Sequence, residues 1–182
     1  MGATPWSLVG PFHRNGRTAL RHAQAEFFDQ NYDLAVVLKE RIGSALQAVQ
    51  ATEMEDEYGL LETYRDTLRR LRRVQVKPLP KTIHGQIELL RRIEALGGSD
   101  IGNILDLQGV ADTRQEGMLC LLSNDEIRTL FGTEKPTRWQ SERALWKVYE
   151  LLGRAEAVGF PVFRARGPRE PVGWYFVGYS AD

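Results

Sequence analysis

The chain has 182 residues, of which 42% are hydrophobic and 26% are charged, and its 24 basic and 24 acidic residues give a formal net charge of zero. These values exclude a disordered chain and are typical of a globular protein, and the length allows one larger domain or two small ones. Zero net charge is unusual for a nucleic-acid-binding domain. The acidic and basic residues lie in separate blocks, however, so one face of the protein can still be basic.

A single cysteine, Cys120, lies in the apolar run MLCLL. One thiol excludes a disulfide within the chain, which suits a reducing compartment, and we expect Cys120 to be a small buried hydrophobe. No stretch approaches the ~18 consecutive apolar residues of a membrane span, and the N-terminus lacks the pattern of a signal peptide. We therefore expect a cytoplasmic protein without a membrane partner.

Residues 1–16 contain two prolines, three glycines and no helical or strand period. This composition predicts an extended N-terminal arm. Trp6 and Phe12 are too apolar for a fully solvated tail, so we expect them to pack on their own domain or on a partner subunit.

Residues 17–76 predict a helical region. One helix begins near Thr18, and Asp33 is positioned to cap the next, which carries an apolar stripe from Leu34 to Val49. The segment AEFFDQNYDLAVVLKERI resembles one tetratricopeptide helical hairpin, but a single unit does not make a repeat array. We interpret it as an ordinary helical hairpin.

Residues 53–76 have the strongest helical composition of this region. Apolar residues recur at spacings of three and four, which is the seam of a coiled coil or an antiparallel helix pair, at Leu61, Tyr64, Leu68 and Leu71. This seam predicts a homodimer or partner interface. The arginines of the cluster 69–73 are interpreted either as a solvated helix end that suits the helix dipole or as a phosphate-binding ridge.

The segment 77–81 contains two prolines and predicts a stiff linker between two domains. The second domain, residues 82–182, is expected to open with a helix at 82–96 that ends at Gly97–Gly98. A short segment at 101–107, a polar loop at 108–117 and a strand at 118–122 are expected to follow.

A capped helix comes next. Ser123 and Glu126 have the spacing of a capping box, and Gly132 is a typical residue after a helix C-terminus. Pro136 suits the start of a second, longer helix running from Trp139 to Leu152, whose outer face is polar and basic.

The chain ends in a predicted β-hairpin with a basic tip. Val162 and Phe163 begin one strand, GPREP forms the turn, and VGWYFVGY forms the return strand. The basic residues at or near the tip are Arg164, Arg166 and Arg169. They are interpreted either as phosphate contacts or as a charged edge that discourages strand pairing.

The order of these elements over residues 118–179 resembles a winged helix-turn-helix. The resemblance implies a mainly α fold, with a helical N-terminal half followed by a winged helix that carries a small antiparallel hairpin or sheet. It also implies DNA binding, with the longer helix in the major groove and the hairpin on phosphates. The residues expected to contact DNA are Thr137, Arg138, Gln140, Ser141, Arg143, Lys147, Arg164, Arg166 and Arg169.

No pattern in the sequence indicates catalysis. His13, His22 and His84 are scattered and form no zinc motif with Cys120, and no phosphate-binding loop, dinucleotide fingerprint or nucleophile elbow is present. We expect no enzyme activity, no cofactor, no metal and no small-molecule substrate.

The sequence therefore predicts a DNA-binding regulator or DNA-associated factor. The alternative is a protein-interaction or assembly subunit whose terminal domain docks on protein, as in accessory subunits of chromosome-condensing complexes or phage-type inhibitors. Four tryptophans are candidate anchors for that alternative: Trp6, Trp139, Trp146 and Trp174. Of these, Trp146 and Trp174 are expected to be core residues.

Overall fold

The computed structural model describes residues 3–54, 56, 58–99, 101–167 and 169–180. The chain divides into two compact units. We call residues 1–27 and 101–182 the sheet unit, and residues 28–100 the helical unit. The linker expected at 77–81 lies inside the helical unit.

The sheet unit is built on a five-stranded mixed sheet with the strand order β1-β5-β4-β3-β2. The strands are β1 Pro5–Pro11, β2 Gly109–Ala111, β3 Met118–Leu121, β4 Ala157–Phe163 and β5 Pro171–Tyr179. β5 pairs antiparallel with both β1 and β4, whereas β3 pairs parallel with both β2 and β4. The protein is thus an α/β protein, and the expectation of a mainly α fold with a small hairpin is wrong.

The hairpin expected to form a peripheral wing is the centre of this sheet. β4 and β5 are interior strands, and buried residues on them face both sides of the sheet. A strand buried on both faces has a continuous apolar run instead of an alternating one, and the runs AVGF and WYFVG have this form. The segment expected to be an N-terminal arm supplies β1, which pairs with β5 from Pro5↔Tyr179 to Pro11↔Gly173.

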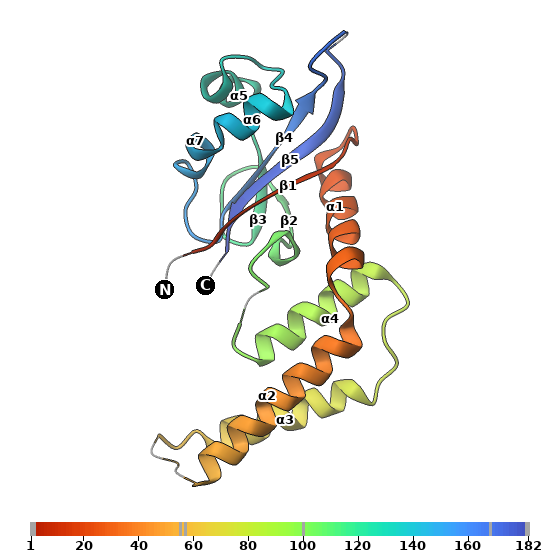
Figure 1. Ribbon diagram of the computed structural model, residues 1–182, viewed down its shortest axis with the longest axis vertical. Helices are drawn as coiled ribbons and strands as arrows, with labels where there is room; N and C mark the ends of the chain where they lie inside the picture. The colour runs from red at the N-terminus through yellow and green to blue at the C-terminus, as the bar shows by residue number, and fades with distance from the viewer. Residues whose placement is uncertain (1–2, 55, 57, 100, 168, 181–182) are drawn as a thin grey trace. The chain divides into compact units, whose positions relative to one another are not determined.

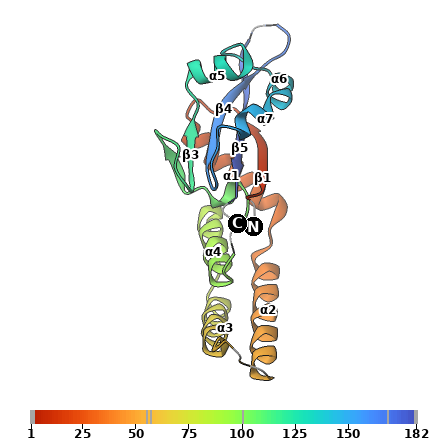
Figure 2. The same cartoon turned by 90° about the vertical axis from the view of Figure 1, so that its left-hand side faces the viewer.

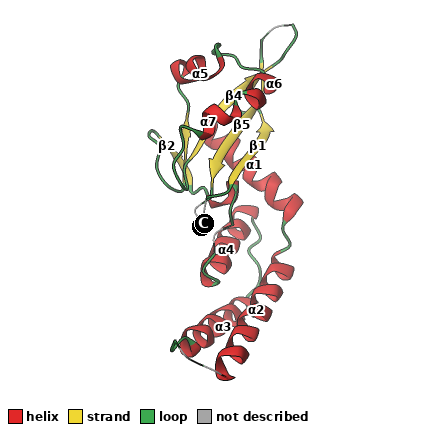
Figure 3. Ribbon diagram, turned by 60° about the vertical axis from the view of Figure 1, so that its left-hand side comes forward, coloured by secondary structure: helices red, strands yellow, loops and turns green. Residues whose placement is uncertain are grey.

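Helices cover both faces of the sheet (Figures 1 and 3). α1 Gly16–Asn31 lies on one face. It packs closely on β1, because a Cβ added to Gly10 would lie 3.0 Å from Ala23 of α1 and 3.2 Å from Phe176 of β5. Gln24 of α1 donates to the carbonyls of Ile104 and Leu107 at 3.0 and 2.8 Å. These bonds tie α1 to the short helix η1 Ile104–Asp106.

The other face carries α5 Asn124–Phe131, α6 Arg138–Arg143 and α7 Leu145–Tyr149. Their apolar residues share one core with alternate residues of the central strands, including Ile127, Val148, Val158, Phe160 and Tyr175. The single longer helix expected from Trp139 to Leu152 is wrong, because Ala144 leaves helical backbone values (φ −103°, ψ 11°) and separates α6 from α7.

The exposed edge of β1 offers few groups to another strand. The Thr4 carbonyl accepts a hydrogen bond from the Ser180 N–H at 3.0 Å. The backbone N–H and C=O groups of even-numbered residues of β1 therefore point toward β5, and those of odd-numbered residues point away from the sheet. Pro5 and Pro11 are of odd number and have no N–H. Ser7 and Val9 therefore carry the outward donors of this strand, a layout that limits edge-to-edge association.

The helical unit contains α2 Leu34–Met54, α3 Leu61–Gln75 and α4 Ile83–Leu96. Asp33 caps α2 as expected, accepting from the Ala35 N–H at 2.8 Å. The helix expected at 53–76 begins only at Leu61. Within this unit Glu94 is buried, pairs with Arg41 and accepts from the Ser99 hydroxyl at 3.0 Å. Over the described ranges, no helix combines the length and the apolarity needed to span a membrane.

Candidate functional site

Four of the five strands point the same way. β2, β3 and β4 are parallel, and β1 has the direction of β4 because both oppose β5. The carboxyl ends of these four strands consequently lie at the same end of the sheet, which we call its carboxyl edge. Ligands of open α/β sheets bind outside the carboxyl ends of the strands, so the side chains at this edge are the first candidates for a binding site.

Segments from distant parts of the sequence meet at the carboxyl edge. β1 leads into residues 12–15 and α1, and β4 leads into the connection to β5, of which residues 164–167 and 169–170 are described. The segment before α6 lies beside the end of β4, since Phe163 N–H donates to the Pro136 carbonyl at 2.9 Å. The β4–β5 loop, α5 and α6 lie at the same end of the sheet unit in Figure 2.

Six exposed basic residues lie on these segments and define what we call the basic edge: Arg14, Arg17, Lys135, Arg164, Arg166 and Arg169. The ion pairs found in the sheet unit involve other cations, namely Arg114, Arg128 and Arg138. No member of the basic edge forms an ion pair with a carboxylate in the part of the chain that the structure describes. Their charge is therefore available to an anionic ligand.

The loop after β1 is held in place at this edge. The Trp174 indole N–H donates to the His13 carbonyl at 2.8 Å, and Asn15 caps α1 by accepting from the Arg17 N–H at 2.8 Å. The first turn of α1 contains no acidic residue and carries Arg17. A cation at this end of a helix is repelled by the helix dipole, so the position of Arg17 does not stabilise α1. The positive end of the dipole and the Arg17 guanidinium would both attract an anion bound outside the helix.

α6 is fixed beside the basic edge by local hydrogen bonds. Thr137 and Gln140 form a capping box, with the Thr137 N–H donating to Gln140 Oε1 at 2.9 Å. Ser141 is fully buried and donates to the Thr137 carbonyl at 3.0 Å. Arg138 pairs with Glu142 at 2.8 Å, and this carboxylate raises the pKa of Arg138. Three of the residues expected to read bases, Gln140, Ser141 and Arg138, thus have partners within α6 or its cap.

Trp139 and Arg143 lie next to each other on the exposed side of α6. The Arg143 guanidinium lies over the Trp139 ring at 4.7 Å from its centroid, and the tryptophan is 62% exposed. Lys147 lies over the ring of Trp146, which is 57% exposed on α7. Its neighbour Tyr149 packs on Tyr179 at the far end of β5, so this second pair lies toward the opposite edge of the sheet. The expectation that Trp146 is a core residue is wrong, whereas Trp174 is buried as expected.

The residues expected to form a partner interface lie in different places. Leu68 and Leu71 are buried within the helical unit, and Leu61 and Tyr64 are half-buried there. Trp6 packs against Gly178 of the neighbouring strand. Phe12 is 37% exposed in the loop next to the basic edge.

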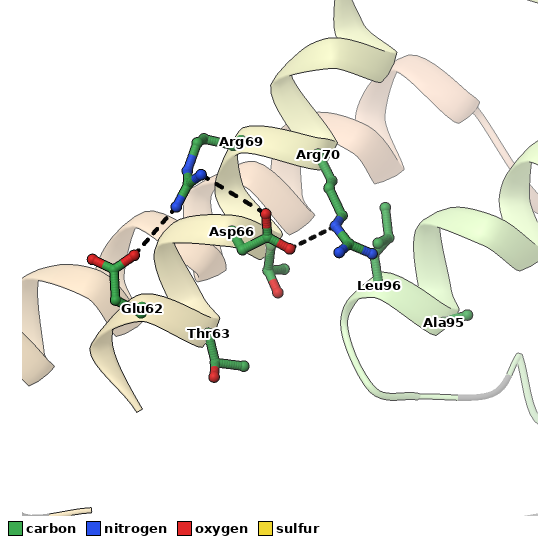
Figure 4. Close-up of a pocket in the computed structure, with 8 residues that line it drawn as sticks. Glu62, Thr63, Asp66, Arg69, Arg70, Ala95 and Leu96 are labelled. Atoms are coloured by element: carbon green, nitrogen blue, oxygen red, sulfur yellow. Dashed lines mark hydrogen bonds and ion pairs between the residues drawn. The ribbon is translucent and has the colours of Figure 1, made fainter. Parts of the chain in front are cut away.

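A groove in the helical unit also contains arginines (Figure 4). It has a volume of about 620 Å³ and is lined by α3 and the end of α4. Asp66 contacts Arg70 at 2.6 Å and Arg69 at 4.0 Å, while Glu62 contacts Arg69 at 3.3 Å. The carboxylates neutralise these arginines, so the groove is a weaker anion site than the basic edge.

Cys120 lies on β3 near the ion pair of Arg114 and Glu126. Burial raises the pKa of the Cys120 thiol, which keeps it protonated and a poor nucleophile. The described residues contain no group of three or more histidine, cysteine, aspartate or glutamate side chains arranged to hold a metal ion.

Arg14, Arg17 and Lys135 were missed by the sequence analysis. The signal that would have found Arg14 and Arg17 is strand β1, which brings the N-terminal loop to the carboxyl edge. Comparison of the chain with protein-family models, with curated proteins and with solved structures gives no match.

Proposed function

We propose that this protein binds nucleic acid without catalysing a reaction, through the basic edge of the sheet unit. One observation carries the proposal: six exposed basic side chains lie on three separate segments next to the carboxyl ends of β1 and β4, and they lack carboxylate partners among the described residues. Phosphate neutralisation by unpaired arginine and lysine supplies most of the affinity of proteins for nucleic acid.

The overall charge of zero is compatible with this proposal, because binding depends on where the charges lie. We include in this proposal a regulatory or nucleic-acid-associated role in the cytoplasm. The single buried cysteine suits that reducing compartment. Major-groove reading by α6 is not expected, because this helix has six residues and its Gln140 and Ser141 form hydrogen bonds within the helix and its cap.

The test is a fluorescence anisotropy titration of labelled mixed-sequence nucleic acid, single-stranded and duplex, at several salt concentrations. We expect affinity to fall steeply with salt. The variant R164A/R166A should bind all sequences more weakly, and the negative slope of log K against log salt should become smaller in magnitude by about 1 to 2.

The matched control is R69A/R70A, which removes two exposed arginines of α3 that already pair with Glu62 and Asp66 in the helical unit. This variant should keep the wild-type affinity and slope. Absence of binding at low salt would overturn the proposal, as would an R164A/R166A variant indistinguishable from wild type.

A second candidate function is docking on another protein as part of a larger assembly. The observation in its favour is the exposure of Trp139 and Trp146, since exposed tryptophans dominate the energetics of protein interfaces. Failure of all nucleic acids to bind, together with a partner whose affinity falls in both W139A and W146A, would favour this candidate.

A further inference from the structure

We infer that Trp139 is a base-stacking platform and that the preferred ligand of the basic edge is a single-stranded nucleic acid. This inference rests on the proposed function and specifies its ligand class. Its starting point is an indole ring that is 62% exposed on α6, beside the end of β4, where the basic edge lies.

The ring is positioned before any ligand arrives. Arg143, one helical turn further along, lies over the Trp139 ring at 4.7 Å from its centroid. The capping box of Thr137 and Gln140 and the buried Ser141 fix the helix that carries the ring. A stacked guanidinium restrains the indole and leaves much of its surface open, so stacking a base on it costs little side-chain entropy.

The surroundings supply the second half of a single-strand site. The end of β4 and the loop that follows carry Arg164, Arg166 and Arg169, and the Lys135 ammonium lies 6.0 Å from the centroid of the Phe163 ring. Proteins that bind single strands combine cationic side chains along the backbone with aromatic rings on which bases stack. A single strand offers both phosphates and unstacked bases at once, whereas the bases of a duplex are stacked on one another and present no free face to an aromatic ring.

The sheet unit contains its own control residue. Trp146 on α7 is also a tryptophan under a cation, 57% exposed with Lys147 at 5.7 Å from its ring centroid, but it lies toward the opposite edge of the sheet. If stacking occurs at the basic edge, removal of Trp139 weakens binding and removal of Trp146 does not.

The experiment measures anisotropy of a labelled single strand of about 16 nucleotides and of the duplex of the same sequence. The proteins are full-length wild type, W139A, W139F and W146A, each checked for folding by far-ultraviolet circular dichroism. We expect tighter binding of the single strand by wild type and a loss of about tenfold in W139A, the size of one lost base stack. W139F should recover most of the loss, the duplex affinity should change less than twofold, and W146A should match wild type.

Other outcomes overturn the inference in distinguishable ways. Wild-type protein that prefers the duplex, or W139A that keeps its single-strand affinity, refutes stacking while leaving the proposed function intact. An equal loss of single-strand and duplex binding in W139A refutes stacking in favour of a general contact. Wild-type protein that binds neither ligand refutes the proposed function itself.

Discussion

At the scale of single residues, the capping box of α5 makes stability depend on pH. Glu126 accepts from the Ser123 N–H at 2.9 Å and from its hydroxyl at 2.9 Å, and it pairs with Arg114. The Ser123 backbone bond is the largest cause that lowers the Glu126 pKa below its ordinary value of 4.5, with the Ser123 hydroxyl and Arg114 acting in the same direction. A carboxylate with a lowered folded-state pKa stabilises the fold above its unfolded pKa.

We therefore expect wild type to lose this contribution as pH falls from about 5 through the lowered pKa. The variant E126Q should be less stable than wild type at pH 7, and the difference should shrink below pH 4.5. Urea unfolding at a series of pH values measures this. D125N is the control, because Asp125 lies in the same turn with its side chain 88% exposed. A constant gap between E126Q and wild type over pH 3–7 would contradict the assignment.

The local signals of the sequence were sufficient at this scale. The capping box of Ser123 and Glu126 and the left-handed Gly132 (φ 71°) are confirmed, because each depends on residues within four positions of one another. Thr137 and Gln140 have the same spacing and form the capping box of α6. Their expected role in contacting DNA was therefore assigned without considering this local explanation of the Gln140 side chain.

At the scale of elements, the pairing of β1 with β5 depends on a close approach of backbone and indole. A Cβ on Gly178 would clash with the Trp6 ring and lie 2.9 Å from the Ala157 Cβ. Groups from both neighbouring strands, β1 and β4, thus enclose this position.

We expect G178A to destabilise the protein by about 1–3 kcal/mol, the usual cost of overpacking. G43A is the matched control, because Gly43 lies inside α2 with nothing within 4 Å of its added Cβ. That change should stabilise the protein by up to about 1 kcal/mol. Chemical denaturation of both variants measures the two effects, and a neutral G178A would show that the Trp6 ring is free to move.

The elements that the sequence did not reveal are those that depend on distant partners. β1 pairs with β5 more than 160 positions later, and its residues Trp6, Leu8 and Val9 are half-buried, so they give no clear alternation. β4 and β5 were predicted as strands of a hairpin, but their place in the middle of a sheet depends on β1 and β3. The basic edge was only partly predicted for the same reason, since Arg14 and Arg17 reach it through β1.

At the scale of the whole molecule, the chain consists of two compact units, and the helical unit is inserted in the sequence between the two segments of the sheet unit. The four tryptophans, Trp6, Trp139, Trp146 and Trp174, all belong to the sheet unit. Tryptophan fluorescence therefore reports on the sheet unit alone, whereas circular dichroism at 222 nm is dominated by helices of both units. The two signals allow the stability of each unit to be followed in one sample.

The variant L71A tests whether the units unfold independently. Leu71 is 1% exposed on α3, and its truncation should destabilise the helical unit by about 2–5 kcal/mol. We expect the transition at 222 nm to begin at lower denaturant, while the tryptophan fluorescence midpoint and the affinity for nucleic acid in the absence of denaturant stay those of wild type. V148A is the matched control, because Val148 is 0% exposed in the core of the sheet unit and its truncation should move the fluorescence midpoint. If L71A lowered both midpoints equally, the chain would unfold as one cooperative unit, and ligand binding at the basic edge would then depend on the helical unit for its stability.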